Sequence, residues 1–185
     1  MIITRSWAMS NKETFRIKPI NEVIQRYLNG GVWVDPFVRA SVFKDQMTFT
    51  NDLNPDFEAT HHMDALEFLK ALSDSSVDGV LFDPPYSPRQ ITECYQGVGR
   101  KTVFADTNAS FWSNLKKEIS RILKPGGVCI TCCWNSGGIG KKYQFEIEEV
   151  LIVPHGSWKH DTICTVDRKQ PTLPTLFNYK DTTNE

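Results

Sequence analysis

The sequence lacks any long apolar run, and no stretch approaches the roughly 18 consecutive apolar residues that a membrane-spanning helix requires. Residues 1–11 also lack the charged segment followed by an apolar segment that is typical of a secretory signal. We therefore expect no membrane interaction and a cytoplasmic location.

The cysteines lack the paired short spacings of a structural zinc site. Their number is odd, which does not suggest a disulfide framework. We expect reduced thiols and no bound metal ion. The five cysteines are Cys94, Cys129, Cys132, Cys133 and Cys164.

The chain has little net charge, formally −1 at pH 7, so nothing attracts it globally to a polyanion. Binding to a nucleic acid therefore requires a local basic face. Its 185 residues, of which 40% are hydrophobic and 23% charged, suffice for one compact core. We find no internal repeat and predict one catalytic domain over residues 1–185, with a loosely held tail over residues 170–185.

Short β-branched apolar runs alternate with polar stretches of helical spacing, which predicts an α/β fold with a mainly parallel sheet. The predicted strands cover residues 32–34, 47–50, 77–82 and 128–133, and residues 147–153 and 162–166 predict an antiparallel hairpin added to the sheet. Helices are predicted over residues 21–28 and 108–123, with a third that carries Leu66, Leu69 and Leu72 on one face. Residues 87–107 are predicted to form an unusually long loop, a candidate substrate lip.

Each of the first three strands ends in an acid, namely Asp35, Asp52 or Asp83. Open α/β sheets bind their ligands at the carboxyl ends of the strands. Asp52 is in a position to accept hydrogen bonds from a ribose hydroxyl pair. Asp64 opens a helix and is either an N-cap or an acceptor for the amino group of a cofactor adenine. Asp35 is in a position to bind an ammonium group. Phe37, on the same loop, is expected to line the pocket.

The segment Asp83-Pro84-Pro85-Tyr86 follows an apolar strand and suits methylation of an exocyclic amine. Such an amine is a poor nucleophile until its two N–H groups are hydrogen-bonded, here to Asp83 and to the main-chain carbonyl of Pro84. The two prolines stiffen the turn, and Tyr86 is suited to stack on a base that has left the duplex. An ordinary strand with a proline turn fits the tetrapeptide alone equally well; the other acids favour the chemical interpretation. Trp134 follows the strand 128–133 and either lines the pocket or packs in the core.

The tetrapeptide matches the D-P-P-Y signature of S-adenosylmethionine-dependent amino-group nucleic-acid methyltransferases. Asp35-Pro36-Phe37 resembles the start of their first cofactor motif, D-P-F-x-G-S-G, and residues 14–20 resemble the segment that covers the methionyl end of the cofactor. From Thr14 to about Lys169, including Asp161-Thr162-Ile163, the chain resembles small phage and prophage DNA adenine methyltransferases.

This resemblance implies a Rossmann-like class I fold with helices on both faces, S-adenosylmethionine as the cofactor and N6 of adenine in DNA as the target, in a bacterial or phage-infected cytoplasm. It implies that Asp83, Pro84, Pro85 and Tyr86 are catalytic. The residues that it implies for cofactor binding are Phe15, Lys18, Pro19, Asp35, Pro36, Phe37, Ala40, Asp52, Leu53, Asp64 and Ala65.

The chain departs from the family in two ways. It has Val38-Arg39-Ala40-Ser41 where many relatives place glycines, so close backbone approach to the cofactor is not guaranteed by glycine. Either the small residues Ala40 and Ser41 leave enough room for this approach, or the affinity for the cofactor is altered. It also has no room for a separate target-recognition domain. We therefore expect relaxed or short sequence specificity, or reading by residues 87–107, where the candidate nucleic-acid contacts are Arg89, Gln90, Arg100 and Lys101.

Two other functions fit the sequence. One is an RNA methyltransferase, because ribosomal-RNA enzymes that act on amino groups share the tetrapeptide. The other is a catalytically silent module with a methyltransferase fold, which the missing glycines favour and the intact tetrapeptide opposes. A protein-glutamine methyltransferase is disfavoured, since that chemistry usually has asparagine at the position of Asp83.

Overall fold

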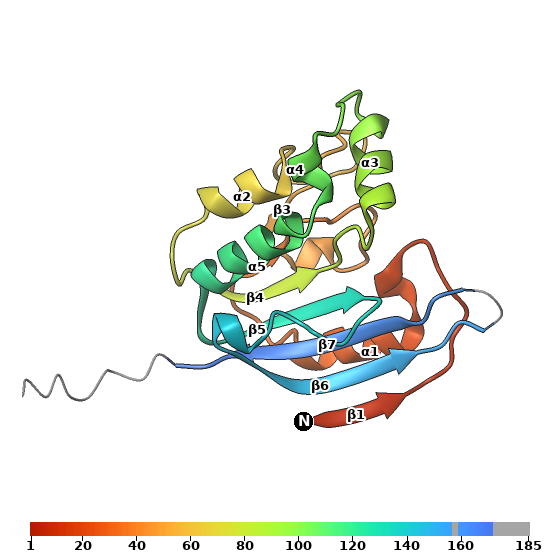
Figure 1. Cartoon of the computed structure of the whole chain (residues 1–185). Helices are drawn as coiled ribbons and strands as arrows, with labels where there is room; N and C mark the ends of the chain where they lie inside the picture. The colour runs from red at the N-terminus through yellow and green to blue at the C-terminus, as the bar shows by residue number, and fades with distance from the viewer. Residues whose placement is uncertain (157–158, 172–185) are drawn as a thin grey trace, which may run out of the picture.

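The protein is built on a seven-stranded β-sheet (Figure 1). The computed structural model describes residues 1–156 and 159–171, so all of the predicted tail except Gln170 and Pro171 lies outside the described residues. The strands are β1 (Ile2–Arg5), β2 (Trp33–Asp35), β3 (Phe49–Thr50), β4 (Val77–Phe82), β5 (Leu123–Cys133), β6 (Phe145–Val153) and β7 (Thr162–Lys169). The α-helices are α1 (Lys18–Tyr27), α2 (Ala65–Ala71), α3 (Pro88–Gly97), α4 (Phe104–Thr107) and α5 (Ser110–Ile122), with short 3-10 helices at Thr14–Arg16, Lys44–Gln46 and Lys141–Tyr143.

The strand order is β1-β6-β7-β5-β4-β2-β3. Strands β3, β2, β4 and β5 pair in parallel, while β7 lies between β5 and β6 and is antiparallel to both. At the far edge, β1 pairs in parallel with β6. The prediction of a mainly parallel sheet with an antiparallel C-terminal hairpin is therefore confirmed.

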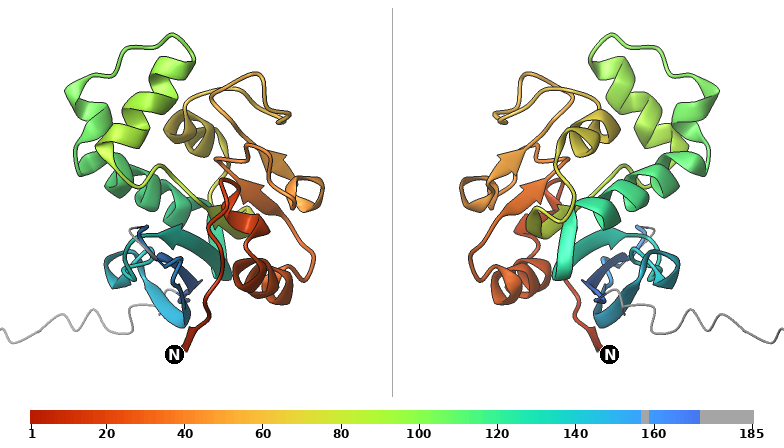
Figure 2. Two further views of the ribbon diagram at one scale, coloured as in Figure 1. Left: turned by 90° about the vertical axis from the view of Figure 1, so that its right-hand side faces the viewer. Right: turned by 90° about the vertical axis from the view of Figure 1, so that its left-hand side faces the viewer.

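Helices cover both faces of the sheet, as predicted, and Figure 2 shows α1 and α5 on opposite sides of its central strands. Successive side chains of β4 point to opposite faces because a strand has a period of two. Leu81 packs in the core cluster that contains Ile20 and Ile24 of α1. Phe82 packs in the other cluster, with Leu115 and the rest of the apolar face of α5.

The prediction that residues 87–107 form a loop is wrong, because the segment contains α3 and α4. Ser87 caps α3 by accepting a hydrogen bond from the Gln90 N–H at 3.3 Å, and proline occupies the first turn, where no backbone donor is needed. Ile91 and Tyr95, one helical turn apart, are buried. This single apolar pair anchors α3 against the domain.

Element boundaries differ from the prediction at several other places. Helix α1 begins at Lys18 rather than residue 21, with a proline in its first turn. Strand β5 begins at Leu123 rather than at residue 128. Strand β1 was not predicted, because all four of its side chains are exposed and carry no alternating apolar pattern.

Within the described ranges, no helix is long and apolar enough to cross a membrane.

The close contact between β4 and β2 yields a stability prediction. A Cβ atom added at Gly79 would lie 2.4 Å from the ring of Trp33, which is buried on the neighbouring strand. Overpacking of this kind costs about 1–3 kcal/mol, so we expect Gly79→Ala to lower the midpoint of urea and thermal unfolding clearly. Gly97→Ala is the control, because a Cβ there meets nothing within 4 Å, and it should change stability by no more than about 1 kcal/mol. Equal stability of the two variants would contradict this packing.

Candidate active site

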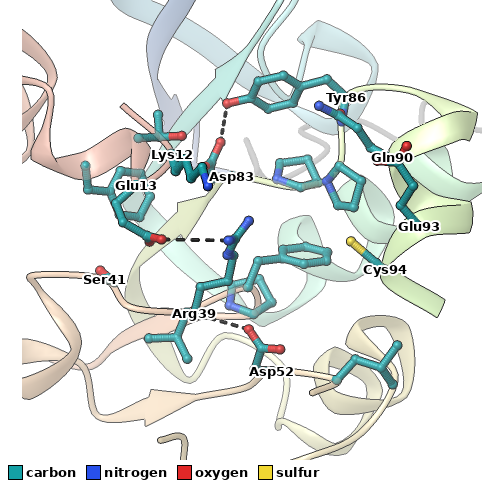
Figure 3. A pocket seen from close by; sticks show the side chains of 18 of the residues that line it. Lys12, Glu13, Arg39, Ser41, Asp52, Asp83, Tyr86, Gln90, Glu93 and Cys94 are labelled. Atoms are coloured by element: carbon teal, nitrogen blue, oxygen red, sulfur yellow. Dashed lines mark hydrogen bonds and ion pairs between the residues drawn. The ribbon is translucent and has the colours of Figure 1, made fainter. Parts of the chain in front are cut away.

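A cleft of about 1040 Å³ lies over the carboxyl ends of the central parallel strands (Figure 3). Residues 10–17, between β1 and α1, form one wall, and α3 contributes another. We call residues 10–17 the cover segment. The loops that follow β2, β3 and β4 form the floor.

Sheet order explains why distant parts of the sequence meet in this cleft. Strand β2 lies between β3 and β4, with Val34 paired to both Phe49 and Val80. Because the three strands are parallel, the chain leaves them at the same edge of the sheet. Asp52 and Asp83 therefore both line the cleft, as predicted.

The Asp83–Tyr86 turn is held by side chains from its surroundings. The Tyr86 hydroxyl donates a hydrogen bond to the Asp83 carboxylate (Figure 3). The backbone N–H of Tyr86 donates to the side-chain oxygen of Gln90 at 2.6 Å, and the indole N–H of Trp112 donates to the carbonyl of Pro85 at 2.9 Å. All four residues of the turn line the cleft.

Burial of the carboxyl group raises the pKa of Asp83 to about 6. Hydrogen bonds from the side chains of Tyr86 and Thr14 lower this pKa, because they stabilise the ionised form. At neutral pH Asp83 is therefore mostly a carboxylate.

Asp52 is held as a fixed acceptor at the other end of the cleft. One carboxylate oxygen accepts the N–H of Asn54 at 2.8 Å and the other accepts the N–H of Arg39 at 3.0 Å. Each oxygen keeps a further lone pair for a ligand. Burial raises the pKa of Asp52, while these two N–H groups lower it.

Asp64 lines the cleft, but protein groups already use its carboxylate. One oxygen caps α2 by accepting the N–H of Leu66 at 3.0 Å. The other accepts hydrogen bonds from the Tyr95 hydroxyl at 2.6 Å and from the Arg100 guanidinium at 3.1 Å. The N-cap interpretation of Asp64 is confirmed.

Asp35 is completely buried and is not among the cleft-lining residues. One of its oxygens accepts the N–H of Phe37 at 3.0 Å, and the other has no partner in the described part of the chain. Burial is the main cause that raises the pKa of Asp35 to about 8. Asp35 thus supports the turn that presents Pro36 and Phe37, which do line the cleft.

The predicted nucleic-acid contacts are mostly engaged elsewhere. Arg89 pairs with Glu93 at 2.8 Å, and Arg100 pairs with Asp64 and Asp106. Gln90 lines the cleft and supports Tyr86. Of the predicted site residues, the structure brings Phe15, Pro36, Phe37, Asp52, Leu53, Asp64, Ala65, Asp83, Pro84, Pro85, Tyr86 and Gln90 together at the cleft. Among the described residues, those that do not line it are Lys18, Pro19, Asp35, Ala40, Arg89, Arg100 and Lys101.

Aromatic rings line the cleft beside the Asp83–Tyr86 turn. Trp134 lies 5.5 Å from Tyr86 in an edge-on arrangement and 4.4 Å from His160 in a tilted one, measured between ring centroids. The Trp134 residue is 40% exposed, so the pocket interpretation of this tryptophan holds over the core interpretation. His160 was not predicted, since a lone exposed histidine after a turn carries no sequence signal.

Arg39 and Glu13 are charged residues of the cleft that were also not predicted as site residues. Arg39 stands at the first substituted glycine position and pairs with Glu13 of the cover segment at 3.7 Å. Both line the cleft. The missing glycine was visible in the sequence, but the direction of the arginine side chain was not.

No family model matches the chain, and no curated protein matches it in sequence. Solved structures do match its fold. A 1,6-didemethyltoxoflavin-N1-methyltransferase of Burkholderia thailandensis, solved with 1,6-didemethyltoxoflavin and S-adenosylhomocysteine bound, has a TM-score of 0.54 at 12% identity, over 83% of this chain and 78% of that chain. TrmN from Thermus thermophilus has a TM-score of 0.55 at 14% identity, over 83% of this chain and 49% of that chain. With these likenesses, the predicted fold is confirmed: the protein has the Rossmann-like fold of methyltransferases.

Proposed function

We propose that the protein is an S-adenosylmethionine-dependent methyltransferase that methylates the N6 amino group of adenine in DNA. The observation that carries this proposal is the Asp83–Tyr86 turn, which presents a half-buried carboxylate beside aromatic rings in the same cleft as Asp52. The methyltransferase fold and the neighbour solved with S-adenosylhomocysteine support the cofactor.

The donor set of the cleft fits S-adenosylmethionine. Asp52 offers free lone pairs to a ribose hydroxyl pair, and Phe37, Leu53 and Ala65 supply apolar surface next to it. Phe15 closes the cleft from the cover segment. When bound, the cofactor supplies a methyl group attached to a positively charged sulfur.

Asp83 prepares the amine that accepts the methyl group. Its carboxylate accepts a hydrogen bond from an N–H of the target amine, which holds the nitrogen lone pair out of the ring plane. Pro84 and Pro85 have no backbone N–H group that could compete with the amine for the Asp83 carboxylate or for the Pro84 carbonyl. Tyr86 and Gln90 fix the turn, so the acceptor atoms are preorganised.

The wall of the cleft suits a single unstacked base. Tyr86, Trp134 and His160 form a continuous series of rings, and aromatic faces replace stacking that a base loses when it leaves a strand. Lys12 and Lys159 at the same cleft supply positive charge for a phosphate backbone. This side of the cleft is better suited to nucleic acid than residues 87–107, whose arginines are paired with acids.

Methyl transfer to DNA and RNA tests the proposal directly. Wild-type protein, incubated with methyl-labelled S-adenosylmethionine, should yield N6-methyladenine in DNA when nucleosides are identified by mass spectrometry. We expect Asp83→Asn to lose about 100-fold or more of this activity, because one preorganised acceptor at the reacting group is typically worth 10²–10³-fold. Asp45→Asn removes an exposed carboxylate away from the cleft and is the control. Label found only in RNA would move the assignment to RNA, and no transfer to either would favour a silent binding module.

The pKa of Asp83 predicts the pH profile of the same reaction. Only the carboxylate form can accept one hydrogen bond from the Tyr86 hydroxyl and another from the target amine, so the rate should rise with pH and be half-maximal near pH 6. Tyr86→Phe removes a hydrogen bond that lowers this pKa, so the acid limb should move to higher pH while the ring remains. An acid limb near pH 4, or an identical limb in Tyr86→Phe, would contradict this role for the pair.

The ring series predicts which aromatic residue matters for DNA binding. Trp134→Ala should weaken binding of a methylatable oligonucleotide by about 5- to 150-fold, the equivalent of 1–3 kcal/mol of stacking per base. Phe104→Ala removes a more exposed ring, at 84%, that lies outside the cleft lining, and it should leave binding unchanged. Fluorescence anisotropy at fixed salt measures both, and an equal effect of the two substitutions would remove Trp134 from the proposed base site.

A further inference from the structure

Arg39 has a backbone conformation that favours glycine. Its φ is +42°, in the left-handed region that few residues other than glycine adopt. Its N–H nevertheless donates to Asp52 at 3.0 Å, so the loop after β2 is fixed in this conformation. A large charged side chain kept in such a backbone position points to a role for the side chain itself.

The guanidinium of Arg39 lies between the two acids that define the ends of the site (Figure 3). Its loop follows β2, and β2 lies between the strands that lead to Asp52 and Asp83. Its positive charge lowers the pKa of both carboxyl groups, which indicates that it is close to each. The guanidinium also lies over the ring of Phe57, with its central carbon 5.6 Å from the ring centroid.

Glu13 is the acid that pairs with this guanidinium. The two charged groups are 3.7 Å apart, the Arg39 side chain is 54% exposed and that of Glu13 is 23% exposed. A pair this wide and this accessible is weak in itself, because water screens it. It presents a cation and an anion side by side to the interior of the cleft.

We infer that Arg39 and Glu13 bind the α-amino acid end of the cofactor, with its carboxylate on the Arg39 guanidinium and its ammonium on Glu13. The inference rests on the proposed function, since it names the residues that hold one end of the proposed cofactor. An α-amino acid carries the two opposite charges on adjacent atoms, and the Arg39–Glu13 pair is complementary to that arrangement. Guanidinium forks match carboxylates in a bidentate geometry.

The other candidate anchors fit less well. Lys18 is exposed, pairs with Glu22 and does not line the cleft. Asp35 is buried beneath the turn that it supports. The Lys159 ammonium donates to the Ser10 hydroxyl at 2.6 Å, at the loop after β6. Of the cations on the described cleft wall, Arg39 alone follows β2, the strand between those that lead to Asp52 and Asp83.

Binding calorimetry with truncated cofactors tests the inference without any catalytic step. The probes are S-adenosylhomocysteine, its analogue without the carboxylate, its analogue without the amine, and 5′-methylthioadenosine, which lacks both groups. Wild-type protein should bind S-adenosylhomocysteine about 10- to 100-fold more tightly than the analogue without the carboxylate, as expected for hydrogen bonds to a charged group. In Arg39→Gly this preference should vanish, while 5′-methylthioadenosine should bind as it does to wild type.

Glu13→Gln should likewise lose the preference for the amine and keep most of the preference for the carboxylate. Arg39→Gly keeps the N–H that binds Asp52 and suits the positive φ, so we expect it to unfold at the same temperature as wild type or higher. Arg5→Ala, which removes an exposed arginine on β1 outside the cleft lining, is the charge control and should bind all four probes as wild type does.

The outcomes separate this inference from the proposed function. If wild type binds 5′-methylthioadenosine and S-adenosylhomocysteine equally, or if Arg39→Gly keeps the carboxylate preference, the inference is overturned while the nucleoside site stands. If wild type binds none of the four adenosine ligands, the proposed cofactor itself is wrong.

Discussion

The parallel pairing of β2 with β3 on one side and β4 on the other is the constraint on which the whole cleft depends. Because of this pairing, the chain leaves three strands at one edge of the sheet, where Asp52, Arg39 and Asp83 all line the same cleft. A strand places successive side chains on opposite faces, so a slip of one residue in the register would move every side chain to the other face of the sheet. Backbone hydrogen bonds in the ladder therefore set the geometry of the site as firmly as any side chain in it.

The cover segment supplies groups that interact with the charged side chains at the carboxyl ends of the strands. Burial works against ionised Asp83, and Thr14 of this segment joins Tyr86 in stabilising the carboxylate. The preceding residue, Glu13, faces Arg39. Neighbouring residues of one short segment thus interact with both the Asp83 carboxylate and the guanidinium of Arg39 beside it.

The central strands and their terminal acids were predictable because they rest on local signals, a short apolar run followed by an acid, and the bounds 77–82 match β4. Helix α3 was missed because its apolar face consists of one buried pair, too short for periodicity to register. The pairing of Arg100 with Asp64 joins residues from different loops, and the sequence carries no trace of it. The substitution at Arg39 was visible, whereas its positive φ and the direction of its guanidinium follow only from tertiary structure.

Strand β1 pairs with β6, so residues far apart in the sequence are paired at the edge of the sheet. Further hydrogen bonds continue this seam, from Ser6 to Ile152 and from Ala8 to Pro154. The cover segment is therefore anchored on its N-terminal side only after the chain has been synthesised through β6. Pairing across so much sequence also carries the largest loop-closure cost, which delays it during folding. Strand β1 is thus among the last elements to reach its place, and the cover segment takes its position in the cleft wall only after β6 has formed.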